Sequence, residues 1–218
     1  VAQQLHGLIP KGAILHTSIF NSLRSWNFFK LDESIRTSCN VGGFGIDGSL
    51  STLLGASLVN PEKKYFCILG DLAFFYDMNV LGNRHVGPNI HILLVNNGVG
   101  TEFKNYDHPA AKWGDDANPF MAASGHFGCK SHVLVKSYAE SLGFKYLSAA
   151  NKEEFNSVKD EFVKESVDRK PVILELFTEP ECESEAIRMI RDIVKDNRTI
   201  AQKIKEKLKK VVSKYIKK

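Results

Sequence analysis

The stretch FCILGDL at residues 66–72, followed by ILLVNNG at residues 92–98, decides how this chain folds. Both are short apolar runs of the kind found in strands that are buried on both faces of a parallel sheet. Asp71 closes the first run and Asn97 closes the second. Because the carboxyl ends of parallel strands meet at one edge of a sheet, we expect Asp71 and Asn97 to face one ligand there. Carboxylate and amide oxygens suit Mg²⁺, which usually adds water and phosphate oxygens, so the motifs predict a Mg²⁺-bridged diphosphate.

Apolar runs alternate with helical patterns along the 218 residues. This alternation predicts an α/β fold of three layers, with a mainly parallel sheet of about six strands and helices on both faces. The expected strands are residues 13–17, 35–38, 65–69, 90–95, 145–147 and 172–177. The expected helices are residues 47–59, 76–85, 131–142, 152–166 and a long C-terminal helix from about 184 to 218. Gly143 is expected to end the third helix and Asn151 to cap the fourth.

Charge is distributed unevenly along the chain, whose net charge is +4. From Asp196 to the end there are nine Lys and Arg residues and two acidic ones, and the rest of the chain is slightly acidic. No basic patch covers the globular part, which argues against nucleic-acid binding. The lysine-rich segment has apolar residues at helical spacing, as in a helix that meets an anionic membrane or a partner. A terminal helix that packs on its own or a partner subunit, with its lysines in solvent, is the favoured interpretation.

These features divide the chain into a globular domain at residues 1–183 and a basic amphipathic helix at residues 184–218. No stretch is apolar enough to span a membrane and no secretory signal opens the sequence. The four cysteines have no metal-binding spacing, which favours free thiols in a reducing compartment. We therefore expect a cytoplasmic protein.

Together the motifs resemble a known family, the thiamine-diphosphate-dependent enzymes. The Gly-Asp-Leu at residues 70–72 and the Asn-Asn at residues 96–97 resemble that family's metal–diphosphate signature. GFGIDGSLST at residues 43–52 and FYDMN at residues 75–79 resemble the C-terminal cofactor domain of the SEPHCHC synthases of the menaquinone pathway. The resemblance implies thiamine diphosphate and Mg²⁺ as cofactors, a 2-oxo acid as substrate, and decarboxylase or carboligase activity.

The resemblance also assigns roles to individual residues. Asp71, Asn97 and the backbone carbonyl of Val99 would bind Mg²⁺, and Ile46 would hold the cofactor in its bent V shape. The other positions implied in cofactor binding are Asn21, Ser22, Phe44, Gly45, Asp47, Gly70, Leu72 and Ala73. Asn21 and Ser22 are expected to end the first strand. Asp47 is expected to cap the following helix rather than act in catalysis. Without the combined motifs, Asp71 would be interpreted as a helix cap and Asn97 as a turn residue.

A long segment at residues 101–130 mixes glycine, proline, histidine and aromatic residues. Loops of this length on an α/β scaffold are commonly functional lids. Glu102, His108 and His126 are its candidate pocket or gating residues. Glu102 is either a carboxylate on the substrate side or simply solvated, and a solvated or structural role is favoured for any single histidine. We expect the segment to be mobile without substrate and to order when the site closes.

Two features of the resembling family are missing from this chain. The glutamate that activates the cofactor comes, in that family, from a pyrimidine-binding domain, so such a domain of the same or another chain is an expected partner, as is a second copy of this chain. Trp26 and Val41 stand where the synthases have arginines for acidic substrates, and Arg24 is out of register. These differences predict a substrate other than isochorismate. The alternative function is a non-catalytic diphosphate-binding module with a regulatory or structural role.

Overall fold

The computed structural model describes residues 1–43, 45–126, 128, 131–164 and 169–196. Six strands form one sheet in the order β2-β1-β3-β4-β6-β5, and every neighbouring pair is parallel. The strands are β1 (Ile14–Thr17), β2 (Arg36–Cys39), β3 (Tyr65–Gly70), β4 (Ile90–Asn96), β5 (Lys145–Ala149) and β6 (Val172–Phe177). The predicted α/β class and parallel sheet are therefore confirmed.

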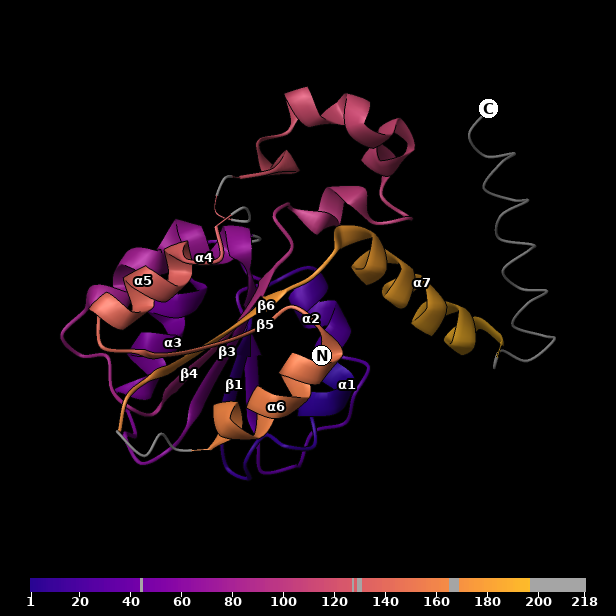
Figure 1. The fold of residues 1–218 in the computed structure, drawn as a ribbon. Coiled ribbons are helices and arrows are strands. Elements are labelled where there is room, and N and C mark those ends of the chain that lie inside the picture. Colours follow the sequence, from indigo (N-terminus) through magenta and orange to yellow (C-terminus); the bar gives the residue numbers. More distant parts are fainter. Residues whose placement is uncertain (44, 127, 129–130, 165–168, 197–218) are drawn as a thin grey trace.

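Helices cover both faces of the sheet (Figure 1). The α-helices are α1 (Ala2–Leu5), α2 (Asn21–Trp26), α3 (Ser49–Ser57), α4 (Asp71–Asp77), α5 (Leu134–Ser141), α6 (Lys152–Val163) and α7 (Pro180–Asp196). Four 3₁₀ segments complete the described elements: η1 (Met78–Gly82), η2 (Thr101–Lys104), η3 (Pro109–Phe120) and η4 (Ala122–Ser124). Figure 1 shows η2–η4 above the sheet, with α7 beside η2.

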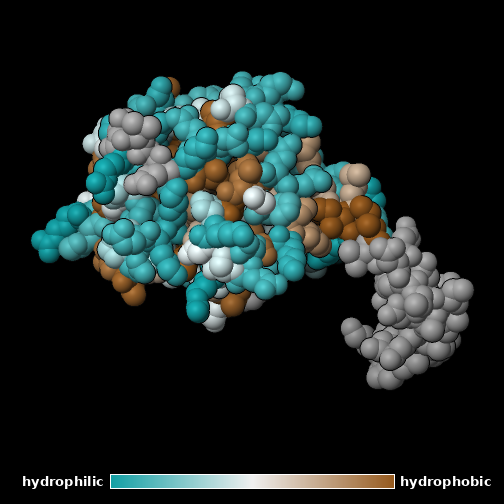
Figure 2. Space-filling model, turned by 90° about the horizontal axis from the view of Figure 1, so that it is seen from below, coloured by the Kyte–Doolittle hydropathy of each residue, from teal (hydrophilic) through white to brown (hydrophobic). Residues whose placement is uncertain are grey.

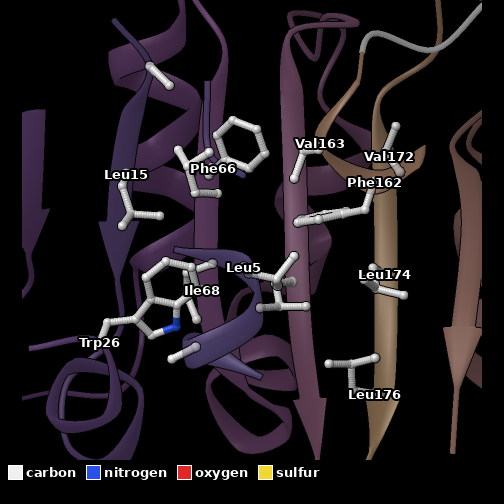
Figure 3. Packing of buried hydrophobic residues seen from close by; sticks show 14 of the residues in the cluster. Leu5, Leu15, Trp26, Phe66, Ile68, Phe162, Val163, Val172, Leu174 and Leu176 are labelled. Atoms are coloured by element: carbon white, nitrogen blue, oxygen red, sulfur yellow. The ribbon is translucent and has the colours of Figure 1, made fainter. Parts of the chain in front are cut away.

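Alternating side chains of β3 and β4 supply two separate hydrophobic cores. On one face, Phe66, Ile68 and Leu93 pack with residues of α1, α2 and α6. On the other face, Leu69 and Leu94 pack with residues of α3, α4 and α5. A strand that is covered on both faces favours apolar residues at nearly every position, which is why β3 and β4 are mostly apolar runs in the sequence, with His91 as the polar residue within β4. Figure 3 shows part of the first core, including Trp26 and Ile68.

Two predicted elements begin at other residues than expected. The helix predicted at residues 76–85 instead starts at Asp71, directly after β3, and continues as 3₁₀ helix from Met78. Asn21 does not end the first strand: β1 ends at Thr17, and Asn21 opens α2. Both errors have one cause, because these strand-to-helix turns are short and carry no capping side chain that the sequence could reveal.

Three expectations about helix ends can be compared with the structure. Asn151 caps α6 by accepting a hydrogen bond from the Glu154 amide at 2.9 Å, and α5 ends before Gly143, whose φ is +84°. The cap predicted at Asp47 is wrong, because the N-cap of α3 is Gly48, whose φ of +74° favours glycine. The C-terminal helix begins at Pro180, four residues earlier than predicted, and its predicted part after residue 196 lies outside the described residues.

The surface seen from below is mainly hydrophilic (Figure 2). Apolar residues gather near its centre and at the end of α7 that adjoins the undescribed residues. In the part of the chain that the structure describes, no helix has the length and apolar character needed to cross a membrane.

Phe162 provides a test of the first core. Its side chain is fully buried and its ring lies edge-to-face with Phe66, at 5.8 Å between centroids. We expect Phe162→Ala to lower the free energy of unfolding by about 3–5 kcal/mol, because it removes a buried ring and leaves a cavity. Urea denaturation measures the effect, and Phe120→Ala is the control because Phe120 is 88% exposed. Equal effects of the two substitutions would contradict this packing.

Candidate cofactor site

A cavity of about 430 Å³ lies at the carboxyl edge of the sheet. Segments that follow four strands line it: Ser18 and Asn21 after β1, Asp71 and Leu72 after β3, Asn97 and Val99 after β4, and Thr178 after β6. The sheet order changes direction between β1 and β3, since β2 lies on one side of β1 and β3 on the other. Ligands of open α/β sheets bind at such a point. The structure thus brings Asp71, Asn97 and Val99 to one cavity.

Asp71 is a deeply buried polar group of this site, with 2% of its surface exposed. Its Oδ1 accepts a hydrogen bond from the Leu72 amide at 2.9 Å. Its Oδ2 accepts one from the Gly98 amide and lies near His126 Nε2, each at 2.6 Å. Burial raises the pKa of the Asp71 carboxyl, and the bonds from His126 and the two amides oppose that rise. Asp71 therefore joins the end of β3 to the loop after β4 and to the 101–130 segment.

The side chain of Asn97 is held from both ends. Its Nδ2 donates to Thr101 Oγ1 at 2.6 Å and to both carboxylate oxygens of Glu183 at 3.1 Å. Its Oδ1 accepts from the Val99 amide at 3.1 Å. Because a carboxylate can only accept, the neighbour Glu183 fixes which end of the amide is nitrogen.

The oxygen atoms of Asp71 and Asn97 at this cavity suit a hard divalent cation. An ionised carboxylate offers about four acceptor positions, of which the hydrogen bonds described for Asp71 use three. Asn97 Oδ1 retains a second lone pair, and Val99 lines the same cavity. Among the described residues, no group of three or more His, Cys, Asp or Glu side chains could hold a metal ion. A cation here would need amide, backbone and ligand oxygens, as Mg²⁺ commonly uses.

The glycine-rich loop before α3 reaches the cavity through Ile46, which is half-buried. Gly45 lies so close to the Asp47 carboxylate that a Cβ there would be only 2.4 Å from Oδ1. Asp47 therefore folds back over its own loop instead of capping α3. Phe44, another of the implied cofactor-binding positions, lies outside the described residues.

An ion pair at the cavity gives Glu102 a defined place. Arg24 holds Glu102 through both guanidinium nitrogens, and the glutamate side chain is 18% exposed. Asn105 Nδ2 donates to Asn21 Oδ1 at 2.9 Å and to Glu102 Oε2 at 3.3 Å. Glu102 is therefore a partly buried, ion-paired carboxylate at the cavity, and its role toward a substrate stays a prediction. No local pattern in the sequence indicates this pair, since 78 residues separate its members.

The two histidines of the 101–130 segment have different surroundings. His108 Nδ1 accepts from the Ala110 amide at 3.1 Å and so caps η3, whereas His126 contacts Asp71. The segment leaves and returns at nearly the same point. The Gly100 amide donates to the Ala123 carbonyl at 2.5 Å, and the His126 amide donates to the Gly98 carbonyl at 3.3 Å. Only His126 of the pair is therefore placed at the predicted metal ligands.

Residues 21–176 match the family described as thiamine pyrophosphate enzyme, C-terminal TPP binding domain. The chain belongs to this family. The matched range begins at Asn21, contains the loops after β3 and β4 that line the cavity, and ends before α7.

Several relatives share one name, 2-succinyl-5-enolpyruvyl-6-hydroxy-3-cyclohexene-1-carboxylate synthase. The protein from Bacteroides fragilis is 33% identical over 170 residues, which is 78% of this chain and 29% of the relative. Those from Phocaeicola vulgatus and Christiangramia forsetii are 33% and 35% identical, over 83% and 81% of this chain and 31% and 29% of the relatives. The resemblance to SEPHCHC synthases is therefore confirmed, and the chain spans less than a third of the length of these relatives.

A buried polar cluster lies beside the site, on the face of the sheet that α5 covers. Glu175 of β6 is fully buried and accepts hydrogen bonds from Asn96 Nδ2 at 2.8 Å and from the Tyr146 hydroxyl at 2.7 Å. Burial raises the pKa of the Glu175 carboxyl, against the effect of these two bonds. This chain therefore carries a carboxyl in its interior, bonded to Asn96, the residue before Asn97.

The direction of this pKa change predicts how stability depends on pH. A raised pKa means that folding favours protonated Glu175, so the free energy of unfolding falls as pH rises through the folded-state pKa. We expect Glu175→Gln to be more stable than the unsubstituted protein at pH 7. The difference should vanish below about pH 4, the pKa of an unfolded glutamate.

Urea denaturation at several pH values measures this difference. Glu181→Gln is the control, because Glu181 is exposed. A stability difference that stays constant with pH would show that titration of Glu175 does not cause it.

Proposed function

We propose that this chain is the cofactor-binding part of a thiamine-diphosphate- and Mg²⁺-dependent enzyme that decarboxylates a 2-oxo acid or joins it to an acceptor. One observation carries the proposal: Asp71 and Asn97, from the ends of adjacent strands, face one cavity in a chain of the thiamine pyrophosphate enzyme family. Asp71, Asn97 and the Val99 carbonyl would hold the cation. The backbone at Gly70, Leu72 and Ala73 would lie against the diphosphate.

The charges around the cavity support a requirement for the metal. Among the described residues, its lining includes the carboxylates of Asp71, Glu102 and Glu183 but no lysine or arginine. A diphosphate that entered without a cation would approach the carboxylates of Asp71 and Glu183, and no lysine or arginine side chain of the described lining would offset them. Mg²⁺ between the carboxylate of Asp71 and the phosphate oxygens removes that repulsion.

The apolar part of the cavity has a separate task. Ile46, Ile19, Phe20 and Val99 offer hydrocarbon surface to a bound ring system and keep water from it. Ile46 would support the bent cofactor. When bound, thiamine diphosphate supplies the electron sink that lets a 2-oxo acid lose CO₂.

Several parts of the proposal concern other chains and segments. The activating glutamate would come from a pyrimidine-binding domain of the same or another chain, so the described domain alone should not turn over. The 101–130 segment would close over the substrate, with Glu102 and His126 beside it and His108 further along. Assembly with a second copy and a cytoplasmic location complete the proposal.

Removing Asp71 tests the metal assignment. In the full-length protein we expect Asp71→Ala to weaken Mg²⁺-dependent binding of thiamine diphosphate by about 100-fold or more. Mutating a residue that only supports a metal ligand commonly lowers metal affinity by about 10–100-fold, and Asp71 is itself a proposed ligand. Isothermal titration calorimetry with and without Mg²⁺ measures it. Asp116→Ala, at an exposed aspartate of η3, is the control and should bind normally. Unchanged affinity in Asp71→Ala would overturn the assignment.

The substrate is expected to differ from that of the relatives named above. Trp26, at one expected arginine position, is 5% exposed and packs in the core beside Ile68 (Figure 3). Val41, at the other, carries no charge, and Arg24 is paired with Glu102. Neither an aromatic nor an aliphatic side chain can form charge-assisted bonds to carboxylates.

We therefore expect the full-length enzyme to form no SEPHCHC from isochorismate and 2-oxoglutarate. Product analysis by mass spectrometry measures this, with calorimetric binding of thiamine diphosphate as the control for an intact site. Formation of that product at a rate usual for enzymes, about 1–10³ per second, would refute the prediction.

A further inference from the structure

Glu183 lies outside the region that matches the family, yet it contacts the predicted metal site. It stands in the first turn of α7, and its two carboxylate oxygens lie 3.1 Å from Asn97 Nδ2. Thr178 Oγ1 donates to Glu183 Oε1 at 2.5 Å. The Thr178 amide donates to the Asn96 carbonyl at 3.0 Å, which ties this turn to the end of β4. The carboxylate is thus held against Asn97 by groups on two neighbouring strand ends.

Contacts along α7 keep Glu183 in this position. The next residue, Ser184, accepts a hydrogen bond at Oγ from the Tyr106 amide at 3.0 Å. One turn further on, Ile187 is buried at the cavity. Arg191 then pairs with Asp107 and donates to the Tyr106 hydroxyl. Glu183 is therefore not a loose side chain at a helix end.

The contact constrains the orientation of the Asn97 amide. If the amide turned over, Oδ1 would face the carboxylate of Glu183, and two acceptors would meet without a proton between them. Nδ2, which cannot ligate a cation, would then take the place of Oδ1. The Val99 amide adds to the preference, because it donates to Oδ1. Glu183 and Val99 together thus leave one orientation, in which the carbonyl oxygen is the end available to a metal.

We propose that Glu183 is a positioning residue of the metal site, which holds Asn97 so that Oδ1 ligates Mg²⁺. The inference rests on the proposed function, since it requires a cation at Asp71 and Asn97. It extends the site beyond the matched residues to α7, whose first turn becomes part of the metal-binding apparatus. Partners of this kind commonly change metal affinity by 10–100-fold.

The experiment measures metal affinity directly in the full-length protein. Binding of Mn²⁺, a paramagnetic substitute for Mg²⁺, is followed by electron paramagnetic resonance with thiamine diphosphate present. We expect Glu183→Ala to weaken Mn²⁺ binding by about 10-fold or more. Glu183→Gln keeps a carbonyl oxygen that can accept from Nδ2, so its affinity should lie nearer to that of the unsubstituted protein. Thermal unfolding without metal checks that each variant is folded.

Glu181→Ala is the matched control, because Glu181 is an exposed acidic residue in the same first turn of α7. It reports any general effect of negative charge at this helix end and should leave the affinity unchanged. If Glu183→Gln is as weak as Glu183→Ala, charge and not the orientation of Asn97 is responsible, and the inference is overturned. An unchanged affinity in Glu183→Ala overturns it too.

Asp71→Ala separates this inference from the proposed function. Loss of Mn²⁺ binding in Asp71→Ala together with normal binding in Glu183→Ala would leave the metal site in place and remove only Glu183 from it. Normal binding in both variants would overturn the proposed metal site itself.

Discussion

The buried carboxylate of Asp71 is the constraint on which the carboxyl edge of the sheet depends. A charge taken out of water must be met by donors, and here the Leu72 and Gly98 amides and the ring of His126 meet it. These donors come from α4, from the loop after β4 and from the end of the 101–130 segment. One side chain thus determines how three segments, far apart in the sequence, lie together. The same requirement makes the position suitable for a cation.

The fold was largely predictable because the apolar sequences of its central strands require burial on both faces. β3, β4 and β6 are covered on both faces, and the sequence shows this as mostly apolar runs, interrupted by His91 in β4 and by Glu175 in β6. Asp71 and Asn97 could be paired because parallel strands end at a common edge. Short elements were harder to predict. The helix α2 has six residues and no side-chain cap, so neither hydrophobic periodicity nor a capping residue indicated it in the sequence.

The rest of the site could not be predicted from the sequence, for a physical reason. The pair of Arg24 and Glu102, and the contact of Glu183 with Asn97, join residues that no local pattern relates. Their geometry depends on how α2 and α7 pack at the cavity, which follows from the tertiary structure alone. For Asp47 a local pattern was misleading. Its position before α3 suggested a helix cap, but Gly48, in the left-handed conformation, is the N-cap residue.

The closed base of the 101–130 segment has a consequence for how this scaffold can diversify. Two backbone hydrogen bonds hold its base together: the Gly100 amide donates to the Ala123 carbonyl, and the His126 amide donates to the Gly98 carbonyl. A loop that is pinned at its base can change length with little penalty, about 0.6 kcal/mol for each doubling of a flexible loop. The residues between these hydrogen bonds can therefore be exchanged or extended to accommodate new substrates, while the proposed metal ligands Asp71 and Asn97 keep their positions.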